Sequence, residues 1–134
     1  MTPRTSVSGA TSSLTYAAPV LRVTDLPRSI AFYRDRLGFA LDFVYEGFYA
    51  SVNRDGAHVH LQAGAPTPRD QAAFEQQEAI DVCLVVHGVA ALAAAFAAAG
   101  VPFTVALRQM PYGEEFYVRD PDGYVLGFVQ PAAE

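Results

Sequence analysis

Apolar residues recur in one early stretch of the chain with the spacing of an amphipathic helix. The intervals are four, three and four residues, and they place on one helical face Leu26, Ile30, Tyr33 and Leu37. Asp25 stands where a helix N-cap is expected, because its carboxylate can accept from the first free backbone N–H groups. Gly38 follows the last apolar position and can take the positive φ that ends a helix. The pattern therefore predicts a helix from about residue 26 to residue 37.

Short runs of β-branched and aromatic residues surround this helix and predict strands. One run precedes the helix at residues 19–23, and three follow it at residues 40–45, 47–53 and 57–62. The last two are joined by Asp55-Gly56, and Asp-Gly is a strong signal for a tight hairpin turn. The predicted order of this half is β-α-β-β-β.

The second half of the chain repeats the same order. A strand is predicted at residues 80–86, followed by a helix that opens at Gly88-Val89 and stops at Gly100. Three further strands are predicted at about residues 102–107, 115–119 and 124–130. Between the halves, residues 63–78 form a linker that is expected to carry a helical turn near residues 71–77.

The two halves align as an internal repeat. Tyr33 aligns with Phe96 at an offset of 63 residues, and His60 aligns with Gly127 at an offset of 67. The offset grows because the second half has a longer predicted loop at residues 108–114. The predicted fold class is therefore α+β, with two βαβββ modules at about residues 17–63 and 80–130 in a single domain over residues 17–130. Each sheet is expected to bury one face under its helix and to offer the other to a ligand cleft.

Composition narrows the possible partners. The net charge of -5 and the sequence pI of about 5.0 argue against binding to the phosphate backbone of nucleic acids, which needs clustered cations. They are compatible with a cationic ligand or with ordinary solubility. No apolar run approaches the ~18 residues of a membrane span. We therefore expect neither a nucleic acid nor a membrane as partner.

The start of the chain and its single cysteine bear on location. Residues 1–16 are rich in Ser and Thr and lack an apolar core, so we expect a disordered leader rather than a secretory signal. Cys83 is the only cysteine, which excludes an intramolecular disulfide and fits a reducing compartment. The sequence thus predicts a cytoplasmic protein.

Two segments resemble a known superfamily. Residues 21–33 read Leu-Arg-Val-Thr-Asp-Leu-Pro-Arg-Ser-Ile-Ala-Phe-Tyr, with Leu-Gly-Phe at residues 37–39. Residues 115–124 read Glu-Phe-Tyr-Val-Arg-Asp-Pro-Asp-Gly-Tyr. They resemble the opening and closing modules of the vicinal oxygen chelate superfamily, which includes glyoxalase I, extradiol dioxygenases, fosfomycin-modifying enzymes and bleomycin-resistance proteins. The resemblance spans roughly residues 17–130 and implies cupped mixed sheets in a homodimer whose clefts are shared between subunits.

The resemblance also implies where a metal would bind. In metal-dependent members the ligands come from the first and last strand of each module, which here means Ala18, His60, Asp81 and Gly127. The repeat leads to the same positions, because an offset of 63 residues relates Ala18 to Asp81 and an offset of 67 relates His60 to Gly127. Ala18 and Gly127 have no side chain that can coordinate a metal, and two ligands fall short of the three that a catalytic metal site normally has. We therefore expect no metal and no other cofactor, which favours a binding protein over an enzyme.

The remaining polar and aromatic residues outline a ligand site. His60 and Asp81 are expected at the cleft, where they could contact a ligand or act together as a general base. Strand alternation places His58 and Gln62 on the same face as His60. The segment 110–116 resembles the loop beside the drug groove of bleomycin-resistance proteins, and it supplies aromatic and acidic groups suited to a planar cation. Further candidate ligand-binding residues are Tyr49, Phe103, Tyr112 and Glu114.

Three functions remain open from the sequence. The first is a small-molecule-binding protein of the bleomycin-resistance type, which sequesters an aromatic or cationic antibiotic without metal catalysis. The second is a lyase, isomerase or dioxygenase of the same superfamily, with His60 and Asp81 as surviving catalytic groups. The third is a non-enzymatic module that binds another protein. No catalytic residue can be assigned from the sequence.

Overall fold

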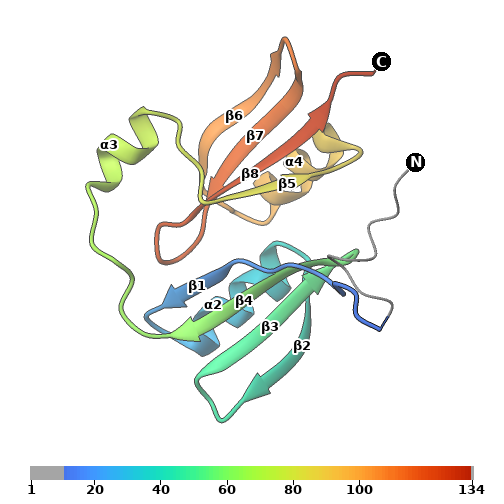
Figure 1. Ribbon diagram of the computed structural model, residues 1–134. Helices are drawn as coiled ribbons and strands as arrows, with labels where there is room; N and C mark the ends of the chain where they lie inside the picture. The colour runs from blue at the N-terminus through green and yellow to red at the C-terminus, as the bar shows by residue number, and fades with distance from the viewer. Residues whose placement is uncertain (1–10, 134) are drawn as a thin grey trace.

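The structure, a computed structural model, describes residues 11–133 and consists of two modules of one topology (Figure 1). The first module contains β1 (Val20–Val23), α2 (Leu26–Ala31), the π-helical turn η1 (Phe32–Arg36), β2 (Ala40–Tyr45), β3 (Tyr49–Arg54) and β4 (Ala57–Ala63). The second contains β5 (Val82–Val85), α4 (Val89–Ala98), β6 (Phe103–Met110), β7 (Gly113–Arg119) and β8 (Val125–Pro131). The linker carries α3 (Gln71–Gln76). The predicted α+β class and paired βαβββ order are confirmed.

Each module forms one four-stranded mixed sheet. Sheet A has the strand order β1-β4-β3-β2, and sheet B has the matching order β5-β8-β7-β6. In both, the first strand pairs in parallel with the last, and the remaining pairs are antiparallel. Figure 1 shows sheet B above sheet A, with the linker and α3 running along one side. The sequence repeat is therefore a repeat of complete folding units.

The first helix follows its predicted pattern with one local difference. All four residues of the predicted stripe are buried, and the Asp25 carboxylate accepts from the Arg28 N–H at 3.1 Å. The last turn is π-helical, with Leu37 N donating to the Phe32 carbonyl at 3.2 Å. Phe32, at the start of this turn, is also buried beside the stripe. Gly38 ends the helix with φ 77°.

The loop predicted at residues 108–114 is wrong. β6 and β7 continue through most of this segment, and Met110 pairs with Gly113, so only Pro111 and Tyr112 form the turn. Gly113 makes this possible, since its φ is 146° and a Cβ there would lie 2.1 Å from the Gln130 carbonyl oxygen. A side chain at this position would separate β7 from β8.

One hydrophobic core extends through both modules. In sheet A, Val59 and Leu61 point toward α2 and are almost fully buried. In sheet B, the Phe116 and Phe128 rings stack with centroids 5.1 Å apart, and Phe96 of α4 packs edge-on against both. The two helices therefore cover one face of their own sheets and contribute to a shared interior.

The turn between β7 and β8 joins the two modules. Tyr33 donates its hydroxyl to the buried Asp120 carboxylate at 2.8 Å, and the Thr24 N–H and hydroxyl both donate to Asp122. The Tyr124 hydroxyl donates to the Arg22 carbonyl at 2.8 Å. Burial raises the pKa of Asp120 to about 6, although the hydrogen bond from Tyr33 acts in the opposite direction. This turn therefore connects the second module to β1, α2 and η1.

Candidate functional site

Strand alternation gives sheet A an open face, the face turned away from α2. His58, His60 and Gln62 point to this face from β4, while Val59 and Leu61 point to the core. On β3, Tyr49 lies opposite Gln62 and Ser51 lies opposite His60. The strand register therefore places His58, His60 and Gln62 on one face, as strand alternation predicts.

His60 lies at the centre of this face and contacts two tyrosine hydroxyls. The Tyr49 hydroxyl is 2.8 Å from Nδ1, and the Tyr16 hydroxyl is 3.3 Å from Nε2. Tyr49 and Phe43 approach the imidazole edge-on, with ring centroids 5.4 and 6.2 Å away. The orientation of the ring is thus fixed by hydrogen bonds on both nitrogens and by aromatic packing.

His58 lies beside it, between a ring and a carboxylate. Tyr16 stacks on the imidazole with centroids 3.7 Å apart and planes 13° from parallel. Nδ1 of His58 lies 3.3 Å from Oδ2 of Asp42, without the geometry of a hydrogen bond. Hydrogen bonds from Ser51 at 2.8 Å and Asn53 at 3.3 Å hold the pKa of Asp42 below its usual value, with Ser51 as the main cause. Asp42 is therefore a fixed negative charge behind His58.

These side chains form one site on sheet A. We call it the His–Tyr cluster, and its members are Tyr16, Asp42, Phe43, Tyr49, His58 and His60. It borders a cavity of about 760 Å³ that lies between the two modules and is lined by His58, Phe39, β5 and the start of α4. Cavities of roughly 300–1,000 Å³ are the usual size of small-molecule sites. The cluster therefore adjoins a space large enough for a drug-sized ligand.

The open face of sheet B has a different character. Glu115 is almost fully buried there and accepts hydrogen bonds from Tyr112 at 2.7 Å and from Arg108 at 2.8 Å. The hydrogen bond to Glu115 raises the pKa of Tyr112 to about 12. Arg108 also forms a bidentate pair with Glu78. These groups are mutually paired, which leaves less polar capacity for a ligand than on sheet A.

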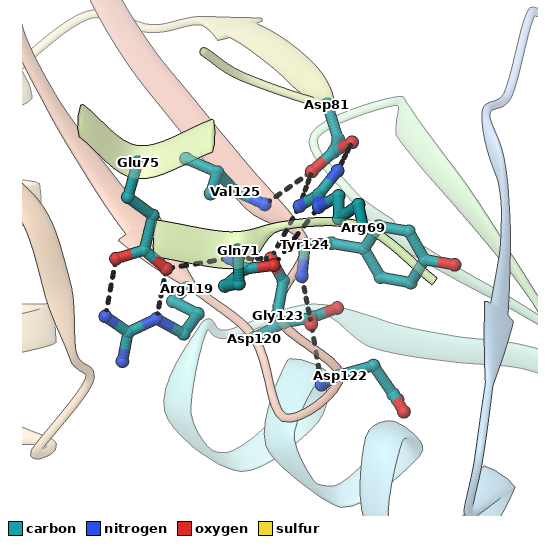
Figure 2. A network of polar contacts seen from close by, with 10 residues as sticks. All are labelled: Arg69, Gln71, Glu75, Asp81, Arg119, Asp120, Asp122, Gly123, Tyr124 and Val125. Atoms are coloured by element: carbon teal, nitrogen blue, oxygen red, sulfur yellow. Dashed lines mark hydrogen bonds and ion pairs between the residues drawn. The ribbon is translucent and has the colours of Figure 1, made fainter. Parts of the chain in front are cut away.

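Asp81 lies just before β5 and is held by an arginine (Figure 2). Its two carboxylate oxygens accept from Arg69 at 2.8 and 3.0 Å, and Oδ2 also accepts from the Val125 N–H at 2.8 Å. Figure 2 shows that the same network includes the pair between Glu75 of α3 and Arg119 of β7. The Asp81 carboxylate therefore helps to attach the linker to the edge of sheet B.

The structure brings some of the predicted site residues together and separates others. His58, His60, Gln62 and Tyr49 share the open face of sheet A. Phe103 packs against Phe116 on the core side of sheet B, with centroids 5.3 Å apart. Tyr112 lies in the β6–β7 turn with its hydroxyl on Glu115, and strand alternation points Glu114 away from Glu115.

Three members of the cluster were missed by sequence reasoning. Asp42 and Phe43 lie at a register shift between β2 and β3, which the alternating pattern of β2 does not reveal. Tyr16 falls within the predicted leader, where no pattern marks it as part of a site. Residues 1–10 of that leader lie outside the described residues, and residues 11–19 form no helix or strand.

The four positions implied for a metal do not fit one. Both nitrogens of His60 contact tyrosine hydroxyls, and both oxygens of Asp81 contact Arg69. At Gly127 a Cβ would lie 3.2 Å from Ile80 and from Tyr117, so apolar groups fill the space that a ligand side chain would need. Among residues 11–133, no group of three or more His, Cys, Asp or Glu side chains is arranged to hold a metal ion.

The chain thus consists of two βαβββ modules, each built on one four-stranded mixed sheet. The family model of the Glyoxalase/Bleomycin resistance protein/Dioxygenase superfamily matches residues 14–128. The chain belongs to this superfamily, as its sequence motifs predicted. No protein with a curated description matches it in sequence. None of the helices in the described part of the chain is long and apolar enough to cross a membrane.

Solved structures support the same fold. A bleomycin-binding protein from the bleomycin producer Streptomyces verticillus, crystallised with copper(II)-bleomycin, is 27% identical with a TM-score of 0.66, over 90% of this chain and 98% of that chain. TioX from Micromonospora sp. ML1 is 21% identical with a TM-score of 0.68, over 90% and 98%. A glyoxalase/bleomycin resistance protein/dioxygenase from Alicyclobacillus acidocaldarius is 17% identical with a TM-score of 0.75, over 88% and 92%. The latter two show the fold alone.

Proposed function

We propose that this protein binds a small aromatic, cationic molecule at the His–Tyr cluster and sequesters it without metal-dependent chemistry. The observation that carries the proposal is the arrangement of Phe43, Tyr49 and His60 on the open face of sheet A, with the fixed carboxylate of Asp42 close by. Aromatic faces attract planar rings and cations, and a carboxylate adds a charge for a cationic group. An antibiotic of this character is the ligand that suits the site best.

Three further observations support this proposal. The net charge of -5 gives a summed field that attracts cations. The 760 Å³ cavity next to His58 provides room for the rest of a ligand. A protein of related fold and 27% sequence identity is described as bleomycin-binding. We further propose that the protein acts in a reducing cytoplasm, which suits its single cysteine, Cys83.

We also propose that the protein works as a homodimer in which a second copy completes each cleft. Large apolar side chains are exposed along β2 and its turn, namely Leu41, Phe43, Val44, Tyr45 and Phe48, and Val85 of β5 is 70% exposed. Within residues 11–133, β1 pairs only with β4 and β5 pairs only with β8, so each sheet has a strand edge for a partner. Sedimentation equilibrium at micromolar concentration should give twice the 14.4 kDa chain mass. A monomer at that concentration contradicts the dimer.

An enzyme of the same superfamily is the alternative function. This enzyme would need His60 and Asp81 to act on a substrate. Both carboxylate oxygens of Asp81, however, already accept hydrogen bonds, from the Arg69 guanidinium and the Val125 N–H. A His60→Ala variant that binds a substrate but no longer turns it over would favour the enzyme. A protein-interaction module, the third possibility, would bind a partner through the exposed apolar residues and leave the cluster empty.

A thermal-shift screen tests the proposed function. Bleomycin and other cationic aromatic antibiotics should raise the melting temperature of the unaltered chain, and His60→Ala should abolish the shift. Tyr117→Phe, which removes a hydroxyl from the open face of sheet B, is the matched control and should retain it. The proposal fails if no such compound stabilises the protein while an electrophilic or diol substrate does.

Metal dependence is tested separately. Because the four implied ligand positions do not fit a metal, EDTA should leave the melting temperature unchanged. Elemental analysis of the purified protein should show less than one equivalent of metal per chain. One tightly bound equivalent of zinc, nickel, manganese or iron would contradict this part of the proposal.

A further inference from the structure

Tyr16 makes three contacts with the two histidines of the cluster, although it belongs to no helix or strand. Its ring stacks on His58 at 3.7 Å, and its edge faces His60 at 6.0 Å and 72°. Its hydroxyl is 3.3 Å from Nε2 of His60. The chain enters sheet A only afterwards, where the Pro19 carbonyl accepts from the His60 N–H at 2.9 Å. Tyr16 is therefore held in the site by its side chain and not by strand pairing of its backbone.

The site presents complementary groups to this phenol. Nδ1 of His60 is engaged by the Tyr49 hydroxyl at 2.8 Å, which orients the ring and directs Nε2 to the position that the Tyr16 hydroxyl occupies. The face of the His58 imidazole covers the phenol ring of Tyr16, and Oδ2 of Asp42 lies 3.3 Å from Nδ1 of the same imidazole. Stacked aromatic rings attract each other, and the hydroxyl of the phenol adds a hydrogen bond to Nε2 of His60.

We propose that the other members of the His–Tyr cluster form a receptor for a hydroxyaryl group and that Tyr16 occupies this receptor as an intramolecular stand-in for the ligand. A ligand that carries a phenol-like ring displaces Tyr16, stacks on His58 and hydrogen-bonds to Nε2 of His60. This inference rests on the proposed function and names the chemical group that the site selects. The backbone around Tyr16 can move away at low cost because Tyr16 itself is 46% exposed and its near neighbour Leu14 is 99% exposed.

The experiment removes the Tyr16 side chain and measures whether a free phenol binds in its place. Tyr16→Ala removes the aromatic ring that occupies the site. Because Tyr16 lies outside both sheets, the variant should fold, and circular dichroism checks this. 4-Methylphenol, which has the same ring and hydroxyl as tyrosine, is titrated into the unaltered chain and into Tyr16→Ala, with binding followed by NMR of the histidine ring protons. We expect the dissociation constant to be at least about tenfold lower for Tyr16→Ala, since the probe no longer competes with a tethered ring.

Two controls test the chemistry of the site. Toluene has the ring without the hydroxyl and should bind Tyr16→Ala several-fold more weakly than 4-methylphenol does. Adding His60→Ala to Tyr16→Ala should remove that preference, because the hydroxyl then has no partner. Equal affinity of both chains for 4-methylphenol, or equal affinity of Tyr16→Ala for the two probes, overturns the inference.

The outcome is separable from that of the proposed function. If bleomycin-type compounds stabilise the protein but Tyr16→Ala gains no affinity for 4-methylphenol, the hydroxyaryl receptor is wrong and antibiotic binding stands. If 4-methylphenol binds Tyr16→Ala as expected while no antibiotic stabilises the unaltered chain, the receptor stands and the proposed antibiotic function is wrong.

Discussion

The two modules share one strand order but use their open faces differently. On sheet A, His60 lies among Tyr16, Tyr49 and Phe43, and polar atoms face outward. On sheet B, Gly127 takes the matching position in the repeat, and Ile80, which lies just before β5, packs against it together with Tyr117. Phe74 of α3, in the linker, packs against the same apolar cluster, so apolar side chains close this face. The two modules thus share one backbone topology, while one open face carries an aromatic and polar cluster and the other is a packed surface.

The two Asp-Gly turns of the repeat show the same divergence. In the first module Asp55 is 94% exposed in its side chain and pairs loosely with Arg54. In the second, Asp120 and Asp122 are inserted against the first module and accept hydrogen bonds from Tyr33 and Thr24. The same local motif therefore serves as a surface hairpin in one module and as the junction between modules in the other.

The largest contrast is expected between the two hairpin glycines. Gly113→Ala places a Cβ 2.1 Å from the Gln130 carbonyl at φ 146°, so unfolding free energy should fall by at least about 3 kcal/mol. Gly47→Ala, in the equivalent turn of sheet A, meets no atom within 4 Å and has φ 74°, so the loss should be about 1 kcal/mol. Urea denaturation of both variants measures the difference. Similar losses would mean that the β7–β8 contact is looser than described.

The next contrast concerns the aligned aromatic residues Tyr33 and Phe96. Tyr33→Phe deprives the buried Asp120 of a hydrogen bond and should cost about 2 kcal/mol. Phe96→Tyr adds a hydroxyl between the buried rings of Phe116 and Phe128, which offer it no hydrogen bond. The unfolding free energy should therefore fall by a similar amount. Calorimetry of both single variants tests this. A neutral Tyr33→Phe would show that the junction does not depend on that hydroxyl.

A third contrast asks which open face binds the ligand. Tyr49→Phe removes the hydroxyl that orients His60, so affinity for the stabilising antibiotic should fall about tenfold. Tyr117→Phe removes a hydroxyl 3.4 Å from Glu115 on sheet B and should leave affinity unchanged. Isothermal titration gives both constants. A larger loss for Tyr117→Phe would move the site to sheet B.

The smallest contrast is in pH dependence. Burial raises the pKa of Asp120 from 3.8 to about 6, so the protonated form is favoured in the folded state. Its contribution to stability is complete below about pH 4 and is lost as pH rises through about 6. Unfolding free energy should therefore gain about 1 kcal/mol from this group between pH 7 and pH 5.

The variant Asp120→Asn isolates this effect. It should abolish the gain between pH 7 and pH 5, whereas Asp55→Asn, at the exposed turn of the first module, should preserve it. Glu75 acts at lower pH, because the hydrogen bond from Arg119 lowers its pKa to about 2 and its contribution is lost as pH falls from about 4.5. An unchanged pH profile in Asp120→Asn would contradict the assignment to Asp120.

Local patterns predicted most of the fold because they depend on neighbouring residues. The helix stripe of Leu26, Ile30, Tyr33 and Leu37 repeats every three or four residues, and the cap at Asp25 and the stop at Gly38 each act on the adjacent turn. The alternation in β4 likewise placed His58, His60 and Gln62 on one face. The β6–β7 hairpin was missed because its closure depends on the approach of Gly113 to β8, which is distant in sequence.

The sequence by itself determined the repeat and the superfamily, because these depend on residue types at fixed spacings. The tertiary structure decided which polar groups are available. It directed Asp81 to Arg69, placed Ile80 over Gly127 and brought Tyr16 onto His58. Each of these contacts joins segments that no local pattern relates, since their partners are chosen by packing across the whole chain.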